Sequence, residues 1–71
     1  MKLADLNINS SAIIQSIEES GVELKLFEFG ILPGRKITIA HKAPFGGPIY
    51  IKVDDNLISL RKKEALTINV E

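Results

Sequence analysis

The chain has 71 residues, 45% of them hydrophobic, and nine basic side chains balance nine acidic ones. This length allows one hydrophobic core, so we expect a single domain over residues 1–71, and no segment approaches the roughly 20 apolar residues that span a bilayer. The absence of cysteine excludes disulfides, thiolate metal sites and thiol catalysis and favours a cytoplasmic location, while the zero formal charge disfavours nucleic-acid binding.

The first predicted strand covers residues 12–17, a short run that is rich in isoleucine. A helix is predicted next, because Val22, Leu26 and Phe29 have the spacing of one helix face. Val22, Leu24 and Leu26 also alternate with the two-residue period of a strand. The pattern alone therefore leaves helix and strand open.

The two ends of this segment decide for a helix. Ser20 and Glu23 have the spacing of a capping box, in which the serine accepts from the backbone N–H of Glu23 and the glutamate reaches back to the cap residue. Gly30 stands where a helix ends in the left-handed conformation that glycine adopts most easily. We therefore expect one short helix between the first and second strands.

Proline and glycine mark the turn that follows the helix. Pro33 followed by Gly34 favours a type II turn, because proline fixes φ at the first central position and glycine allows a positive φ at the next. Residues 36–42 then predict a strand, with Ile37 and Ile39 on one face and polar residues on the other.

The segment 43–48 is predicted to be a hairpin loop. It contains Pro44, Gly46, Gly47 and Pro48, and such a run cannot continue a β-ladder. The remaining predictions are a strand at 49–53, a polar turn at 54–56, a strand from residue 58, a turn at 61–65 and a last strand at 66–70. Five short strands with tight turns indicate a mainly β fold, a compact five-stranded barrel.

Groups that catalyse reactions or bind metals are scarce. His41 is the only histidine, and it stands at the end of a predicted strand. Asp54 and Asp55 lie in the predicted polar turn, where turn chemistry explains them. A ferrous site would need two or three histidines and carboxylates held together. We therefore predict no catalytic residue, no metal ligand and no cofactor, and we do not expect an enzyme.

Four residues are instead candidates for contact with a partner. Phe45 lies with Pro44 in the glycine-proline loop, where it either projects as an anchor or folds back to cap the barrel. Phe27 lies about 100° from the predicted buried helix face, so it either meets the partner or flanks the core. Arg61 and the two lysines after it either pair with acidic partner groups or form a solvated turn.

Three segments stand out together, namely GILPG at 30–34, APFGGP at 43–48 and SLRKKEA at 59–65, and they follow an opening LADL at 3–6. In their order and spacing they resemble the FeoA family, the small protein A of bacterial ferrous iron transport. Each motif alone is common, because glycine and proline turns are frequent. Their combination covers nearly the whole chain and is specific to the family.

This resemblance implies an SH3-like barrel and a cytoplasmic role beside ferrous iron transport protein B, a membrane permease with a GTP-binding domain. The same domain ends metal-dependent repressors of the diphtheria-toxin type, so transition-metal binding enters only as an association of the family. The chain departs from the family pattern at residues 24–29, which are less basic, and at Gly47, where an acidic or polar residue is common. Both departures concern partner specificity.

The leading hypothesis is a non-enzymatic accessory or regulatory protein that binds the cytoplasmic part of the ferrous permease. The alternative is an SH3-like module that binds proteins or peptides of another regulatory system. An aromatic-lined peptide groove would be thin, because the chain has one tyrosine, three phenylalanines and no tryptophan. A small RNA-binding barrel is disfavoured by the neutral charge. Self-association is left open.

Overall fold

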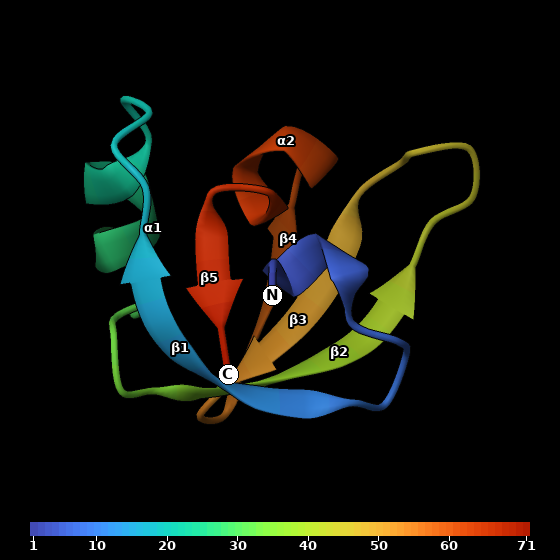
Figure 1. Cartoon of the computed structure of the whole chain (residues 1–71). Coiled ribbons are helices and arrows are strands. Elements are labelled where there is room, and N and C mark those ends of the chain that lie inside the picture. The colour runs from blue at the N-terminus through green and yellow to red at the C-terminus, as the bar shows by residue number, and fades with distance from the viewer.

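Five strands form one antiparallel sheet in the order β4-β3-β2-β1-β5, which confirms the prediction of a mainly β, five-stranded fold. Figure 1 shows the computed structural model, which describes residues 1–71. The sheet curls around the hydrophobic core. In chain order the elements are η1 (Leu3–Asp5, a 3₁₀ turn), β1 (Ser11–Ile17), α1 (Glu23–Glu28), β2 (Lys36–Lys42), β3 (Ile49–Val53), β4 (Asn56–Leu60), α2 (Lys62–Ala65) and β5 (Ile68–Val70).

The curl of the sheet has local causes. The register shifts between Ile14 and Ser16 where β1 pairs with β5, and between Ile39 and His41 where β2 pairs with β3. Such bulges bend a strand and increase its twist. The N-terminal segment joins the same sheet, because the Val70 N–H donates to the Met1 carbonyl at 2.8 Å.

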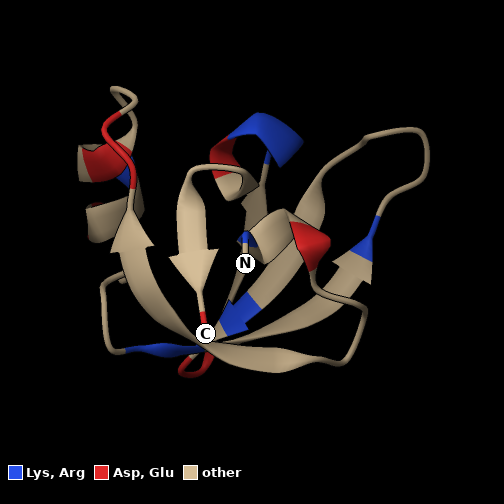
Figure 2. Cartoon of the chain, in the orientation of Figure 1, with Lys and Arg blue, Asp and Glu red and all other residues tan.

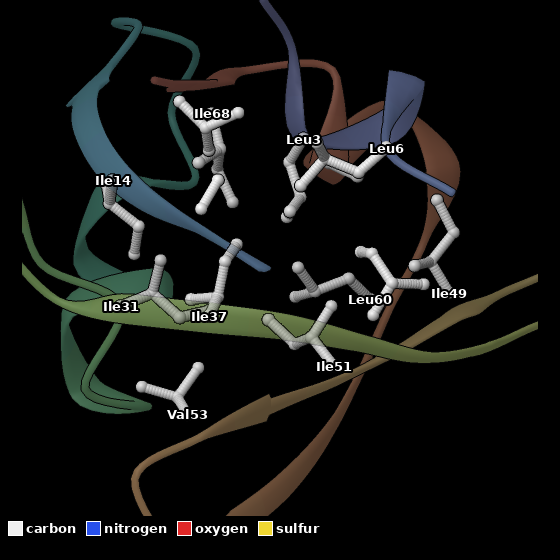
Figure 3. Close-up of a cluster of buried hydrophobic side chains, with 14 of the residues drawn as sticks. Leu3, Leu6, Ile14, Ile31, Ile37, Ile49, Ile51, Val53, Leu60 and Ile68 are labelled. Atoms are coloured by element: carbon white, nitrogen blue, oxygen red, sulfur yellow. The ribbon is translucent and has the colours of Figure 1, made fainter. Parts of the chain in front are cut away.

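The core lies inside the curved sheet and consists of fifteen buried apolar residues (Figure 3). Alternation along β2 and β3 turns Ile37, Ile39, Ile49 and Ile51 inward, and Leu3 of η1 meets them from the open side. Short branched side chains fill this narrow interior. None of the helices is both long and apolar enough to cross a membrane.

Helix α1 forms where predicted, but its N-terminal cap differs from the expected capping box. Val22 occupies the cap position without a side-chain hydrogen bond. The Glu23 carboxylate accepts the backbone N–H groups of Ser20 and of Gly21, whereas the Ser20 hydroxyl caps nothing. Gly21 has a φ of +87°, which is not helical, and the cap position lies at Val22, two residues after Ser20.

The predicted burial of Phe29 on this helix is wrong. Leu26 is fully buried, but Phe29 is 40% exposed. The helix ends at Glu28, and Gly30, with φ +85°, reverses the chain so that the Ile31 N–H donates to the Leu26 carbonyl at 3.0 Å. Ile31 then enters the core in the place expected for Phe29.

The turn after the helix is held from two directions. The Arg35 N–H donates to the Leu32 carbonyl at 3.1 Å across Pro33 and Gly34, and Gly34 has a φ of +92°. The Gly34 N–H also donates to the Ile14 carbonyl at 2.8 Å. The turn therefore fixes α1 beside β1.

The last predicted strand was too long at its start. Leu66 caps α2, its N–H donating to the Lys62 carbonyl at 3.0 Å, and its side chain is 42% exposed. A full helical turn replaces the simple turn expected here, because the Glu64 carboxylate accepts the Arg61 N–H at 2.9 Å and stabilises the first turn. The strand then begins at Ile68.

Candidate partner-binding site

The loop between β2 and β3, residues 43–48, projects from the sheet at the upper right of Figure 1. Its base is closed by the Ala43 N–H, which donates to the Pro48 carbonyl at 2.9 Å. Its tip is closed by the Gly47 N–H, which donates to the Pro44 carbonyl at 3.1 Å. Phe45 and Gly46 have φ angles of +59° and +72°, the sign pattern of a type I′ turn, whose twist suits a hairpin.

Phe45 at this tip is fully exposed, with a relative accessibility of 102%, so it projects into solvent and does not fold back on the barrel. Its left-handed backbone is rare for a bulky residue and costs about 1–2 kcal/mol. Neither the exposure nor the strain stabilises the fold. An aromatic side chain held in this way requires an explanation outside folding.

Phe45→Gly is expected to raise the free energy of unfolding by about 1 kcal/mol, because glycine adopts a positive φ without steric cost. Urea denaturation followed by circular dichroism would measure the change. Leu57→Gly is the matched control, since Leu57 is also exposed but stands in β4 with ordinary backbone angles, where glycine should destabilise by roughly 0.5–1 kcal/mol. A loss of stability in both variants would contradict the strain at Phe45.

Gly47 is required for a different reason, the close approach of two chain segments. A Cβ atom added at Gly47 would lie 2.8 Å from the Ala43 Cβ and 3.1 Å from the Pro44 carbonyl oxygen. Any side chain at this position would push the two arms of the loop apart. Glycine at position 47 therefore has a steric cause in this chain.

Basic residues surround the loop. Lys42 ends β2, and Arg61, Lys62 and Lys63 belong to the neighbouring α2 segment, shown in blue in Figure 2. A hollow of about 570 Å³ lies between loop and α2, lined by Gly46, Gly47, Pro48, Ser59, Arg61 and Lys63. We call residues 42–48 and 59–63 together the loop–α2 surface. The structure thus brings Arg61 next to the loop that carries Pro44 and Phe45.

Phe27 lies apart from this surface. It is on α1, 43% exposed, and α1 and the 43–48 loop stand on opposite sides of the barrel in Figure 1. Leu24 and Phe29, 70% and 40% exposed, accompany it on this helix. The four predicted contact residues therefore divide into one surface with Pro44, Phe45 and Arg61 and a separate position at Phe27.

Glu64 joins the two helices, a role that was not predicted from the sequence pattern. Its side chain is nearly buried. The carboxylate accepts one hydrogen bond from the Lys25 ammonium at 2.7 Å and one from the Arg61 backbone N–H at 2.9 Å. The hydrogen bond from Lys25 is the main cause that lowers the pKa of Glu64, supported by the Arg61 N–H and opposed by burial. The three-residue spacing between Arg61 and Glu64 is the signal that would have found this cap.

Potential metal ligands do not gather at one place in the structure. No group of three or more histidine, cysteine, aspartate or glutamate side chains is placed to hold a metal ion. His41 lies beside Tyr50 on the neighbouring strand, with ring centroids 5.9 Å apart. The exposed Phe45 and the basic residues beside it make the loop–α2 surface suited to binding another molecule.

The curled five-stranded sheet with its short helices defines the chain as an SH3-like barrel. The chain belongs to the FeoA domain family, whose model matches residues 1–71. The resemblance seen in the three turn motifs is thereby confirmed.

Individual relatives agree with this assignment. The Fe(2+) transport protein A/Fe(2+) transporter FeoB fusion protein of Porphyromonas gingivalis is 36% identical over an alignment of 72 positions, which covers 100% of this chain and 8% of the fusion. The iron(II) transport protein A structure from Clostridium thermocellum is 45% identical, with a TM-score of 0.90 over 100% of this chain and 44% of that one.

A third relative was solved with a metal. The structure of Stenotrophomonas maltophilia FeoA complexed with zinc, described as a procaryotic SH3 domain protein, is 26% identical, with a TM-score of 0.87 over 100% of this chain and 89% of that one. The side chains of the present chain do not fit a zinc site, because no three potential ligands are grouped. The zinc is therefore a property of that relative.

Proposed function

We propose that this chain is an accessory protein of bacterial ferrous iron uptake, which works in the cytoplasm by binding the cytoplasmic part of the ferrous permease and catalyses no reaction itself. Membership of the FeoA family supports the transport role. The fusion relative supports the partner, because it carries a domain like this chain and the transporter FeoB on one polypeptide. Such linkage raises the effective concentration of two modules that act together.

The exposed, strained Phe45 is the observation that carries the proposed contact. Aromatic residues that fill a partner's pocket contribute a large share of binding energy at protein interfaces. Two backbone hydrogen bonds and the close approach at Gly47 hold the loop that carries Phe45, so little backbone entropy of the loop remains to be lost on binding. Pro44 and Arg61 would contact the partner around it, and Phe27 is a second, separate contact candidate.

Phe45→Ala is expected to reduce the amount of chain retained by tagged permease about tenfold or more, because an anchor residue contributes roughly 2 kcal/mol. The two proteins would be co-expressed, purified from detergent-extracted membranes with and without GTP, and quantified on gels. Leu57→Ala is the matched control, since Leu57 is 65% exposed on β4 and does not line the loop.

The outcomes separate the partner from the contact surface. If the wild-type chain is retained in neither nucleotide condition, the accessory role at the permease fails. If Phe45→Ala and Leu57→Ala are retained equally well, the partner stands and the 43–48 loop is not its contact.

A further inference from the structure

The loop–α2 surface has an unbalanced charge. The large hollow beside the loop contains Arg61 and Lys63 and no carboxylate. A second hollow of about 180 Å³ contains Lys42 and Lys62 and again no carboxylate. In a chain with no net charge, four cations gathered around six uncharged loop residues are a local excess.

The cations of residues 61–63 form no salt bridge with a carboxylate of the chain. The three salt bridges of the structure join Lys2 to Glu18, Lys25 to Glu64 and Arg35 to Asp54. Glu64, the acidic residue of α2, is nearly buried and directed to Lys25 and to a backbone N–H. The guanidinium and ammonium groups of residues 61–63 are left for an external anion.

We propose that the loop–α2 surface binds an acidic segment of a partner protein, whose carboxylates meet Arg61, Lys62 and Lys63 while Phe45 enters an adjoining apolar pocket. This inference rests on the proposed function in one respect, that the acidic segment belongs to the ferrous permease. Arginine presents a planar pair of donors that matches a carboxylate. Complementary charge around a central aromatic anchor orients the partner and raises the rate of association.

The arrangement of the hollows favours a peptide chain over a flat anionic surface. Gly46 and Gly47 line both hollows, one of which also contains the buried Ile49 and the other the exposed Ser59. The hollows therefore lie on two faces of one loop, and an occupant has to pass around the loop to fill both. A polypeptide can do so, whereas a bilayer contacts one face.

The acidic end of the molecule gives a second argument against a bilayer. Glu18 and Glu19 follow β1, and Glu23 begins α1. The red segment between β1 and α1 lies at the same upper end of the view in Figure 2 as α2 and the 43–48 loop. Anionic headgroups brought against this end would meet these carboxylates as well as the lysines. A narrow acidic segment avoids that repulsion.

Titration of the full-length ¹⁵N-labelled chain with a short peptide of glutamate and glycine around one leucine tests the proposal. We expect saturable amide shifts at Gly46, Gly47 and residues 61–63, and an affinity that falls about tenfold as salt is raised. The same peptide with glutamine in place of glutamate should leave these signals unchanged.

A pair of charge-reversed variants provides the matched control. Arg61→Glu/Lys63→Glu is expected to abolish peptide binding, and Lys36→Glu/Lys52→Glu, with the same change of charge on exposed residues of β2 and β3, is expected to retain it. Absence of saturable shifts with the glutamate peptide would overturn the proposal. So would equal losses in both variants, or binding to phosphatidylglycerol vesicles that is tighter than binding to the peptide.

Co-purification with the permease distinguishes this inference from the proposed function. If the permease retains Arg61→Glu/Lys63→Glu as well as the wild type, the proposed binding of an acidic segment is wrong, and the accessory role at the permease still holds. If the wild type binds the glutamate peptide but not the permease, the surface chemistry stands and the partner is a different protein.

Discussion

Ile51→Ala is expected to lower the free energy of unfolding by about 3–4 kcal/mol, because Ile51 is completely buried in the core and the shortened side chain leaves a cavity there. A core of this size rarely provides more than roughly 3–5 kcal/mol of net stability. The variant should therefore be largely unfolded at room temperature. Urea denaturation of the wild type and thermal scans of both proteins by circular dichroism would measure the loss.

Ile13→Ala serves as the control for this prediction. Ile13 lies on β1 and is 40% exposed, so removing the same atoms should cost less than about 1 kcal/mol. Similar losses in the two variants would show that side-chain volume in the curled interior is not what stabilises the barrel.

Glu64→Gln is expected to destabilise the chain by about 1–2 kcal/mol at neutral pH. The nearly buried carboxylate holds Lys25 of α1 and the first N–H of α2 at once, and hydrogen bonds to charged groups contribute more than neutral ones. Lys25 is half exposed, so solvent screening keeps the effect at the lower end of the range for buried ion pairs. Glu28→Gln, a surface change on α1, should alter stability by less than about 0.5 kcal/mol.

The difference in free energy of unfolding between wild type and Glu64→Gln should decrease as the pH is lowered. Folding lowers the pKa of Glu64, so its contribution is fully present above the unfolded-state pKa of about 4.3 and is lost as pH falls through the lower folded-state pKa. Chemical denaturation of both proteins from neutral to strongly acidic pH would measure this. A difference that stays constant across that window would contradict the ionised Glu64–Lys25 pair.

The local features of this protein were predictable from short stretches of sequence. Alternation of isoleucine and valine within β2 and β3 marks which side chains face inward, since strand geometry repeats every two residues. Turn chemistry at Pro33 and Gly34, and in the 43–48 segment, placed the chain reversals correctly because those preferences belong to the residues themselves.

The errors arose where one element's end depends on another element's packing. Phe29 has the spacing of a buried helix residue, but the reversal at Gly30 gives that place to Ile31. Leu66 has the spacing of a strand residue, but α2 extends to it because Glu64 caps the helix while bound to Lys25 on α1. No pattern within a few residues contains that long-range contact.

By itself the sequence determined the strand and turn order, the inward-facing residues of β2 and β3 and the scarcity of potential catalytic groups, because each follows from residue type and short spacing. Only the tertiary structure decided that Phe45 is fully exposed on a left-handed backbone and that Arg61 reaches the same surface while Phe27 does not. The physical reason is that the folded sheet sets the distances between residues far apart in the chain, and side-chain exposure depends on those distances.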